Sequence, residues 1–269
     1  MRHKFLAAIT AAAATALMST AVAAPSAAAP RALIHYVALG DGYSSGLGAG
    51  DYLPNDCRRS RNAYPWVWVE EHRPASFVYA ACAGAATVDV AEGQVPVLNR
   101  NTTLVTVTVG AADADFAGVV RRCVVQPVNP GLCDEALGFA ESVIRNGLPP
   151  ALAETYRRIR QHAPNARVVV AGYPHLFDAA TECTAATREH RVRINKMVDD
   201  ADALIETQAR AAGFRFADVR QAFHGHEVCA PGGPDEEWIL RIEHDGASYH
   251  PNATGQRHGY LPPVSAAIA

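Results

Sequence analysis

The sequence lacks the signatures of several common protein classes. No two of its cysteines are spaced C-x-x-C, which argues against a structural zinc site. Beyond its N-terminal region it has no apolar run of the ~20 residues that a membrane span needs. Its formal net charge is −3, so the composition offers no basic excess for a nucleic acid or an anionic membrane. These absences leave a small molecule as the expected partner.

The first residues have the pattern of a secretory signal peptide. A basic start is followed by an alanine-rich apolar run that ends at Val22, and small residues offer a cleavage site of the A-x-A type. A membrane anchor is the alternative, but the run is only weakly apolar and leads into small residues and Pro25. We therefore predict a signal peptide over residues 1–23, a disordered leader over residues 24–32 and a secreted protein without a stable membrane anchor.

The rest of the chain, residues 33–269, is long enough for one α/β domain with a sizeable core. It contains no internal repeat and no shift in composition that would mark a linker. We expect a single domain and a monomer.

Short β-branched or aromatic runs alternate with helical patterns along this domain. The expected strands are Leu33–Leu39, Ser76–Ala80, Leu104–Val109, Arg167–Ala171 and Phe214–Val219, and the expected helices are Tyr64–His72, Leu148–His162 and about Thr184–Ala212. Most strand runs are continuously apolar, as in a sheet buried on both faces. The alternation predicts a three-layer α/β/α fold of the flavodoxin-like kind with a mostly parallel sheet. In such folds the site lies beyond the carboxyl ends of the strands.

Six cysteines follow the predicted signal peptide: Cys57, Cys82, Cys123, Cys133, Cys183 and Cys229. An even number in an exported chain predicts three disulfides, since export leads to an oxidising compartment. Pairing neighbours in chain order would close the smallest loops, but the spacing alone leaves other pairings open. Each bridge would stabilise the fold by ~2–4 kcal/mol.

Several motifs occur in a fixed order along the chain. They read YVALGDGYSSGLGAG, NAYP, ACAGA, VTVGAADADF, VVVAGYP, GHEVC and SYHPNATGQ. Together they resemble the secreted bacterial branch of the SGNH (GDSL) lipases and esterases over about residues 35–262. The resemblance implies ester hydrolysis without a cofactor or metal. It also implies disulfides paired in chain order, Cys57–Cys82, Cys123–Cys133 and Cys183–Cys229.

The family is named for a Ser nucleophile, a Gly, an Asn and a His. Its G-D-S motif reads G-D-G here, and its G-x-N-D motif reads G-A-A-D. The resemblance places these four functions at Gly42, Gly84, Ala112 and His250. The chain thus keeps the Gly and the His, and it departs from the family at the nucleophile and at the Asn that donates to the oxyanion.

Both departures bear on catalysis. Gly42 has no oxygen with which to form an acyl-enzyme, and removing a catalytic serine costs ~10⁶ in kcat. Ala112 cannot donate a hydrogen bond to the oxyanion, and loss of one such donor costs ~10²–10³. The two changes together favour a non-catalytic homologue. The alternative is an active esterase on acyl lipids or acetylated glycans that uses an unconventional nucleophile or a water activated by His250.

Parts of the reaction centre remain even so. In the family the backbone N–H groups at the positions of Gly42 and Gly84 are oxyanion donors, and His250 is the inherited base. We expect empty space where the serine hydroxyl would lie, in a small polar pocket that holds an ester, a fatty acid or a glycan-like ligand. The Asp that often orients the base is replaced by Ala247, so a main-chain carbonyl or Asp245 would take that role.

Other residues have simpler interpretations. Ser44 and Ser45 follow the turn, and we expect them to cap the next helix. The turn is no dinucleotide loop, because Ser45 stands where that motif needs its third glycine. Trp66 and Trp68 are expected to pack a helix. Histidines gather toward the C-terminus without helical ligand spacing, and we expect no metal there: His224, His226, His244, His250 and His258.

Overall fold

The computed structural model describes residues 33–125, 129–243 and 246–269. The predicted signal peptide and leader, residues 1–23 and 24–32, lie outside these ranges. Over the described residues, none of the helices combines the length and the apolar character that crossing a bilayer requires.

The described residues form a five-stranded sheet in the order β2-β1-β3-β4-β5, and every neighbouring pair of strands is parallel. The strands are β1 (His35–Gly40), β2 (Ser76–Tyr79), β3 (Leu104–Thr108), β4 (Arg167–Ala171) and β5 (Arg215–Ala217). All residues of β3 are buried, whereas the edge strand β2 exposes every second residue. The predicted parallel sheet is confirmed, with a shorter last strand than the sequence indicated.

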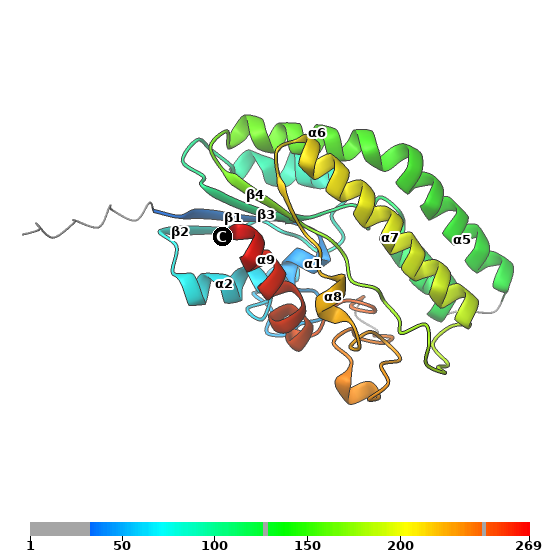
Figure 1. Cartoon of the computed structure of the whole chain (residues 1–269). Helices are drawn as coiled ribbons and strands as arrows, with labels where there is room; N and C mark the ends of the chain where they lie inside the picture. The colour runs from blue at the N-terminus through cyan, green and yellow to red at the C-terminus, as the bar shows by residue number, and fades with distance from the viewer. Residues whose placement is uncertain (1–32, 126–128, 244–245) are drawn as a thin grey trace, which may run out of the picture. The chain divides into compact units, whose positions relative to one another are not determined.

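Helices cover both faces of this sheet, as Figure 1 shows. On one face lie α5, α6 and α7, and on the other lie α2 and α9. Their bounds are α2 (Tyr64–His72), α5 (Pro130–Ser142), α6 (Leu148–His162), α7 (Arg188–Ala211) and α9 (Leu261–Ile268). The predicted three-layer α/β/α fold is confirmed.

Shorter helical segments link or extend these elements. Four are α-helical, namely α1 (Gly42–Ser45), α3 (Thr87–Asp89), α4 (Phe116–Val120) and α8 (Arg220–Phe223). Wider π-helical turns are η1 (Val90–Gln94), η3 (Arg121–Val125), η4 (Val143–Gly147) and η6 (Gly255–Tyr260). Two 3₁₀ turns are η2 (Val95–Val97) and η5 (Pro234–Glu236). Because η4 joins α5 to α6, the chain is helical without a break from Pro130 to His162.

Two helix predictions differ from the structure. Helix α5 was not predicted, although Asn129 caps it and Pro130 stands at its first position. Gly131 and Gly138 lower its intrinsic helix propensity, so its stability comes from packing. Helix α7 begins at Arg188 and not near Thr184, because the Thr187 side chain caps its first turn.

The three disulfides follow chain order, as the resemblance implied. They join Cys57 to Cys82, Cys123 to Cys133, and Cys183 to Cys229, with sequence separations of 25, 10 and 46.

The topology determines where a site can form. The chain runs from β1 outward to β2, and then returns to place β3 on the other side of β1. At such a reversal the loops beyond the carboxyl ends of the two central strands part and leave a crevice. The turn at Gly42 follows β1, and the loop at Ala112 follows β3.

Candidate active site

The turn after β1 is fixed by contacts with the end of β3. Gly40 has a φ of 122°, and a Cβ there would lie 2.3 Å from the carbonyl oxygen of Thr108, so only glycine fits. The N–H of Asp41 donates to the same oxygen (3.0 Å), and the Gln94 amide bonds both the N–H and the C=O of Gly40. These contacts hold the turn whatever side chain stands at position 42.

Asp41 is the polar anchor of the turn. Its carboxylate is buried, with 3% of the residue exposed, and it accepts hydrogen bonds from the Tyr43 N–H (3.0 Å), the Thr108 hydroxyl (2.6 Å) and the Tyr173 hydroxyl (2.6 Å). Burial raises the pKa of Asp41 from an ordinary value of 3.8 to about 6, because desolvation outweighs these bonds. The bond to the Tyr43 N–H also makes Asp41 the N-cap of α1.

The expected capping by Ser44 and Ser45 is therefore wrong, since Asp41 takes that place. The Ser44 hydroxyl accepts the Thr108 N–H (3.1 Å) and lies 3.0 Å from the Tyr64 hydroxyl. The Ser45 hydroxyl donates to the carbonyl oxygen of Gly42 (3.3 Å). Both serines are fully buried and bonded within the frame of the turn.

The space at position 42 is filled and not empty. A Cβ built on Gly42 would lie 2.7 Å from Nε2 and 3.0 Å from Cδ2 of His250. The imidazole approaches the backbone more closely than any side chain at position 42 would allow. The His250 ring therefore lies against the Gly42 backbone, at the place where a Cβ would stand.

The His250 ring is held in one orientation. Its Nδ1 lies 3.1 Å from the carbonyl oxygen of Ser248, and its ring packs 4.7 Å from the Tyr43 ring and 6.0 Å from the Phe116 ring. A carbonyl only accepts, so Nδ1 carries a proton, and Nε2 is the ring nitrogen that lies toward Gly42. One predicted orienting group, a main-chain carbonyl, is present, while Asp245 lies outside the described residues.

Two backbone donors face the same region. The N–H groups of Gly42 and Gly84 have no acceptor within residues 33–125, 129–243 and 246–269. Gly84 has a φ of 79°, and no atom lies within 4 Å of where its Cβ would be, so this glycine borders open space.

Asp113 links the loops that carry Gly84 and Ala112. Its carboxylate accepts the Thr87 hydroxyl (2.6 Å) and the Thr87 N–H (2.9 Å). The hydroxyl of Thr155 on α6 donates to the Thr87 carbonyl oxygen (3.3 Å) and so adds a second contact to the same loop. The Asp of the G-x-N-D pattern therefore positions the neighbouring loop here.

These loops surround one pocket, which we call the site pocket. Its walls include Gly42, Gly84, Ala112 and His250, together with Leu47 and Phe116. All four residues predicted from the motifs thus line the same space, a cavity of about 140 Å³. The surroundings are more apolar than the sequence led us to expect, because most side chains around the two backbone donors are aliphatic or aromatic.

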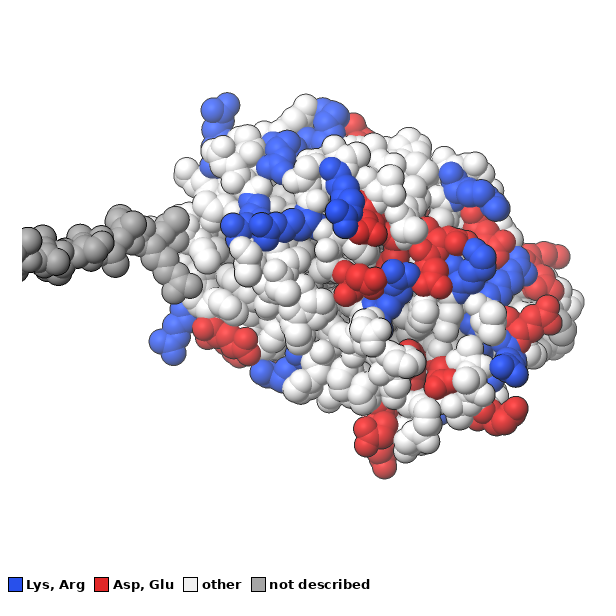
Figure 2. Space-filling view, in the orientation of Figure 1, with Lys and Arg blue, Asp and Glu red and all other residues white. Residues whose placement is uncertain are grey.

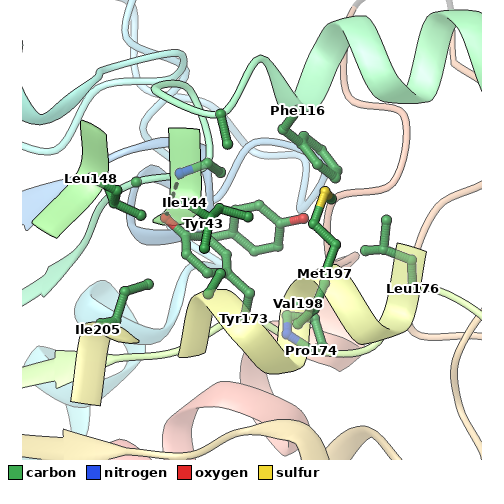
Figure 3. A pocket seen from close by; sticks show the side chains of 14 residues that line it. Tyr43, Phe116, Ile144, Leu148, Tyr173, Pro174, Leu176, Met197, Val198 and Ile205 are labelled. Carbon is green, nitrogen blue, oxygen red and sulfur yellow. Dashed lines mark hydrogen bonds between the residues drawn. The ribbon is translucent and has the colours of Figure 1, made fainter. Parts of the chain in front are cut away.

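A second pocket, which we call the apolar pocket, adjoins the site pocket. Tyr43, Ala111 and Phe116 line both. In Figure 3 the Tyr43 and Tyr173 rings line the middle of this pocket, with Leu148 and Ile205 on one side and Phe116, Leu176 and Met197 on the other. This pocket is small, a cavity of about 40 Å³.

Tyr173 lines the apolar pocket and forms hydrogen bonds with residues that line the site pocket. Its hydroxyl accepts the Ala111 N–H (3.2 Å) while donating to Asp41, and its own N–H donates to the buried carboxylate of Asp202 on α7 (3.0 Å). Tyr173 belongs to the motif VVVAGYP, but no role was predicted for it from the sequence. The signal available was its place directly beyond the end of β4.

Comparison with known proteins agrees with this geometry. The model of the GDSL-like Lipase/Acylhydrolase family matches residues 38–258. The chain belongs to this family. Lipase 1 of Streptomyces coelicolor is 42% identical over 236 residues, and a lipase of Streptomyces rimosus is 40% identical over 239 residues; each alignment covers 86% of both chains.

Solved structures of family members are also similar. A phospholipase A1 from Streptomyces albidoflavus superimposes with a TM-score of 0.82 at 40% identity, and an extracellular lipase from Streptomyces rimosus with 0.83 at 37%. Each comparison covers 87% of this chain and 99% of the other. The resemblance seen in the motifs is confirmed.

Among the residues that line the two pockets in the described part of the chain, only Tyr43 and Tyr173 carry a hydroxyl group. No serine, threonine or cysteine lines either pocket within the described residues. The Tyr43 hydroxyl donates to the Tyr249 carbonyl oxygen (3.0 Å), and burial raises its pKa well above the ordinary value. It is therefore poorly suited to act as a nucleophile.

The remaining predicted residues lie outside the site. Trp68 is buried 5.2 Å from the Tyr36 ring, and Trp66 packs against Phe77 (6.1 Å), as expected of helix packing. The His226 ring stacks on Trp238 at 3.6 Å and its Nδ1 lies 2.8 Å from the Glu236 carbonyl oxygen.

Proposed function

We propose that this chain is a non-hydrolysing member of the GDSL family that binds an acyl ester, or the matching fatty acid, in the site pocket. One observation carries the proposal: position 42 has no reactive atom, and the His250 Nε2 lies 2.7 Å from where a Cβ there would be. An acyl-enzyme needs an oxygen between the imidazole and the substrate, and in this conformation that place is taken.

The same site is suited to binding. The N–H groups of Gly42 and Gly84 are available to a carbonyl or carboxylate oxygen, as oxyanion donors are in the family. The narrow apolar pocket begins beside them and fits an acyl chain better than a sugar. The printed names of relatives, lipases and a phospholipase A1, support an acyl ligand over an acetylated glycan.

A second candidate is a slow hydrolase in which His250 activates water. The hydrogen bond from Nδ1 to the Ser248 carbonyl supports it, because this bond leaves Nε2 as a proton acceptor directed into the pocket. Such an enzyme would use one direct step without a covalent intermediate.

We further propose that the protein is secreted as a monomer after removal of residues 1–23, with 24–32 as a leader to the domain at 33–269. The basic and apolar start supports export. So do the three disulfides, which form in oxidising compartments. One relative is described as an extracellular lipase.

Calorimetric titration tests binding. Decanoate should bind, whereas acetate and an acetylated sugar should produce no measurable heat, because neither fills the apolar pocket. Absence of heat from every straight-chain acid would contradict the binding function, and a response to the acetylated sugar alone would favour a glycan ligand.

Ester turnover separates the two candidates. The wild-type protein and the His250→Ala variant should hydrolyse p-nitrophenyl decanoate at the same background rate. The control is His258→Ala, which alters an exposed histidine outside both pockets. Wild-type turnover that survives in the control and disappears with His250 would establish the water-activating hydrolase instead.

A further inference from the structure

A third hollow lies on the outer side of the apolar pocket. This outer groove runs between α5–η4 and α7 and is lined by Glu141, Ile144, Arg145, Lys196, Met197 and Asp200, among others. Ile144 and Met197 also line the apolar pocket, and no other residue is common to the two linings. The three hollows thus lie next to one another in a row, and the side chains of Ile144 and Met197 separate the second from the third.

We propose that Ile144 and Met197 set the length limit for the acyl chain that this protein binds. The inference rests on the proposed function, since it concerns the far part of the same ligand. A chain that enters from the site pocket and outgrows the apolar pocket has to pass between these two side chains to reach the outer groove.

The properties of the wall match this role. Ile144 and Met197 are each 5% exposed, so they fill the boundary between the two spaces. They come from separate elements, η4 and α7, and no covalent link closes the gap between them. Met197 is unbranched and flexible, which lets a single side chain open or close the passage.

The outer groove differs sharply from the pocket behind it. Lys196 pairs with Asp200 (2.6 Å), and Glu141 pairs with Arg193 (2.8 Å). Figure 2 shows basic and acidic side chains intermingled over the surface where α5 and α7 lie. A methyl end that emerges there meets water and charges, so extra methylenes beyond the wall gain no burial.

This arrangement predicts a dependence of affinity on chain length with a definite end. Each methylene buried in the apolar pocket should tighten binding roughly fourfold. Once the chain end reaches Ile144 and Met197, further methylenes should leave the affinity unchanged or weaken it.

The experiment is calorimetric titration of the purified protein with straight-chain fatty acids from hexanoate to palmitate, each below its micelle concentration. Met197→Ala should move the point where affinity stops rising to a longer acid, because the apolar pocket and outer groove then merge. Met197→Phe should move it to a shorter acid.

Val198→Ala is the matched control. Val198 is the next residue on α7, is buried and lines the apolar pocket, but it does not line the outer groove. Its truncation should weaken binding of all acids that fill the pocket without moving the length limit. A limit that moves equally in Val198→Ala and Met197→Ala would overturn the role of the wall.

The outcomes also separate this inference from the function beneath it. If no acid binds to the wild type, the proposed function itself fails. If acids bind with a length limit that neither Met197 variant moves, the binding function stands and the wall assignment is wrong.

Discussion

Neighbouring residues at the centre of this site have very different surroundings. Asp41 matches the family pattern and accepts three hydrogen bonds, while Gly42 beside it has no side chain and lies under the His250 ring. The loop after β3 repeats this contrast, since Asp113 holds Thr87 while Ala112 beside it has only a methyl group. Both aspartates are held by hydrogen bonds, whereas positions 42 and 112 carry no side chain that could attack an ester or donate to its oxygen.

The difference shows that shape and reactivity rest on separate groups. Asp41, Ser44, Gln94 and Asp113 bond backbone atoms and hydroxyls of the frame, so their replacement would disturb the fold. Positions 42 and 112 contribute no side chain to those contacts. A chain can therefore change them and keep a pocket with two available N–H groups.

The largest effect is expected from placing the family's serine and asparagine at positions 42 and 112. The double variant Gly42→Ser with Ala112→Asn should hydrolyse p-nitrophenyl decanoate at least ~10³-fold faster than the wild type, because the frame already holds both positions. The hydrolysis rate of Gly42→Ser alone should be ~10²–10³-fold lower than that of the double variant, because position 112 then has no side-chain donor to the oxyanion. Stopped-assay kinetics would measure both.

The new serine has to displace the His250 ring, since its Cβ would begin 2.7 Å from Nε2. Gly138→Ser, an exposed substitution on α5, is the control and should leave the background rate unchanged. An inactive double variant that folds and binds decanoate would show that the frame no longer supports catalysis.

A second test compares two disulfides at different distances from the centre. Replacing Cys183 and Cys229 by alanine should lower the free energy of unfolding by ~4 kcal/mol, and replacing Cys57 and Cys82 by ~3.5 kcal/mol, as expected from loops of 46 and 25 residues. Urea unfolding would give both values.

Only the Cys57–Cys82 pair should also weaken ligand binding. The Cys57 carbonyl accepts the Ala83 N–H (3.0 Å) and the Cys82 N–H donates to Gly40 (2.9 Å), so this bridge supports the loop at Gly84. Equal losses of decanoate affinity in the two double variants would show that the Cys57–Cys82 bridge has no special role in supporting the loop at Gly84.

The third test uses the pH dependence of stability. The folded state binds the Asp41 proton more tightly than the unfolded state, since burial raises its pKa from 3.8 to about 6. The contribution of this group is therefore fully present below pH ~4 and is lost as the pH rises through ~6, a change of about 3 kcal/mol. Asp41→Asn has no such titration.

The measurement is urea unfolding of both proteins between these limits. The stability of the wild type relative to Asp41→Asn should fall by about 3 kcal/mol as the pH rises. A difference that stays constant or rises would mean that the hydrogen bonds to Asp41 outweigh its desolvation.

The smallest effects are expected from single aspartate replacements, one beside the site pocket and one on the protein surface. Asp113→Ala leaves the Thr87 N–H and hydroxyl without their acceptor and should cost ~1–3 kcal/mol of stability and weaken decanoate binding. Asp200→Ala removes the exposed pair with Lys196 and should cost under ~0.5 kcal/mol with no change in binding. Thermal unfolding and titration would compare them, and equal effects would refute the positioning role of Asp113.

Local patterns predicted much of the fold. Helices α2 and α6 begin and end where the sequence indicated, and each has a proline in its first turn. Helix α5 was not predicted because its glycines lower the helix propensity of the segment. It is stabilised by packing against α7, which the local sequence does not show. The position of Gly42, Gly84, Ala112 and His250 around one pocket follows from motif order and sheet topology.

Other features of the site depend on contacts that no local pattern records. The close approach of His250 to Gly42 joins residues more than two hundred positions apart. The apolar pocket is built from α1, α4, η4, α6 and α7, whose residues read in sequence as ordinary core. The hydrogen bond from the Tyr173 hydroxyl to Asp41 likewise joins residues 132 positions apart, and it opposes the rise in pKa that burial causes.

The claim that the centre has no nucleophile is tested most directly by a fluorophosphonate probe and intact mass spectrometry. The wild-type protein should gain no mass, and Gly42→Ser should gain one phosphonyl group that maps to position 42. A phosphonyl group on the wild type, mapped to another side chain in the site pocket, would contradict the account.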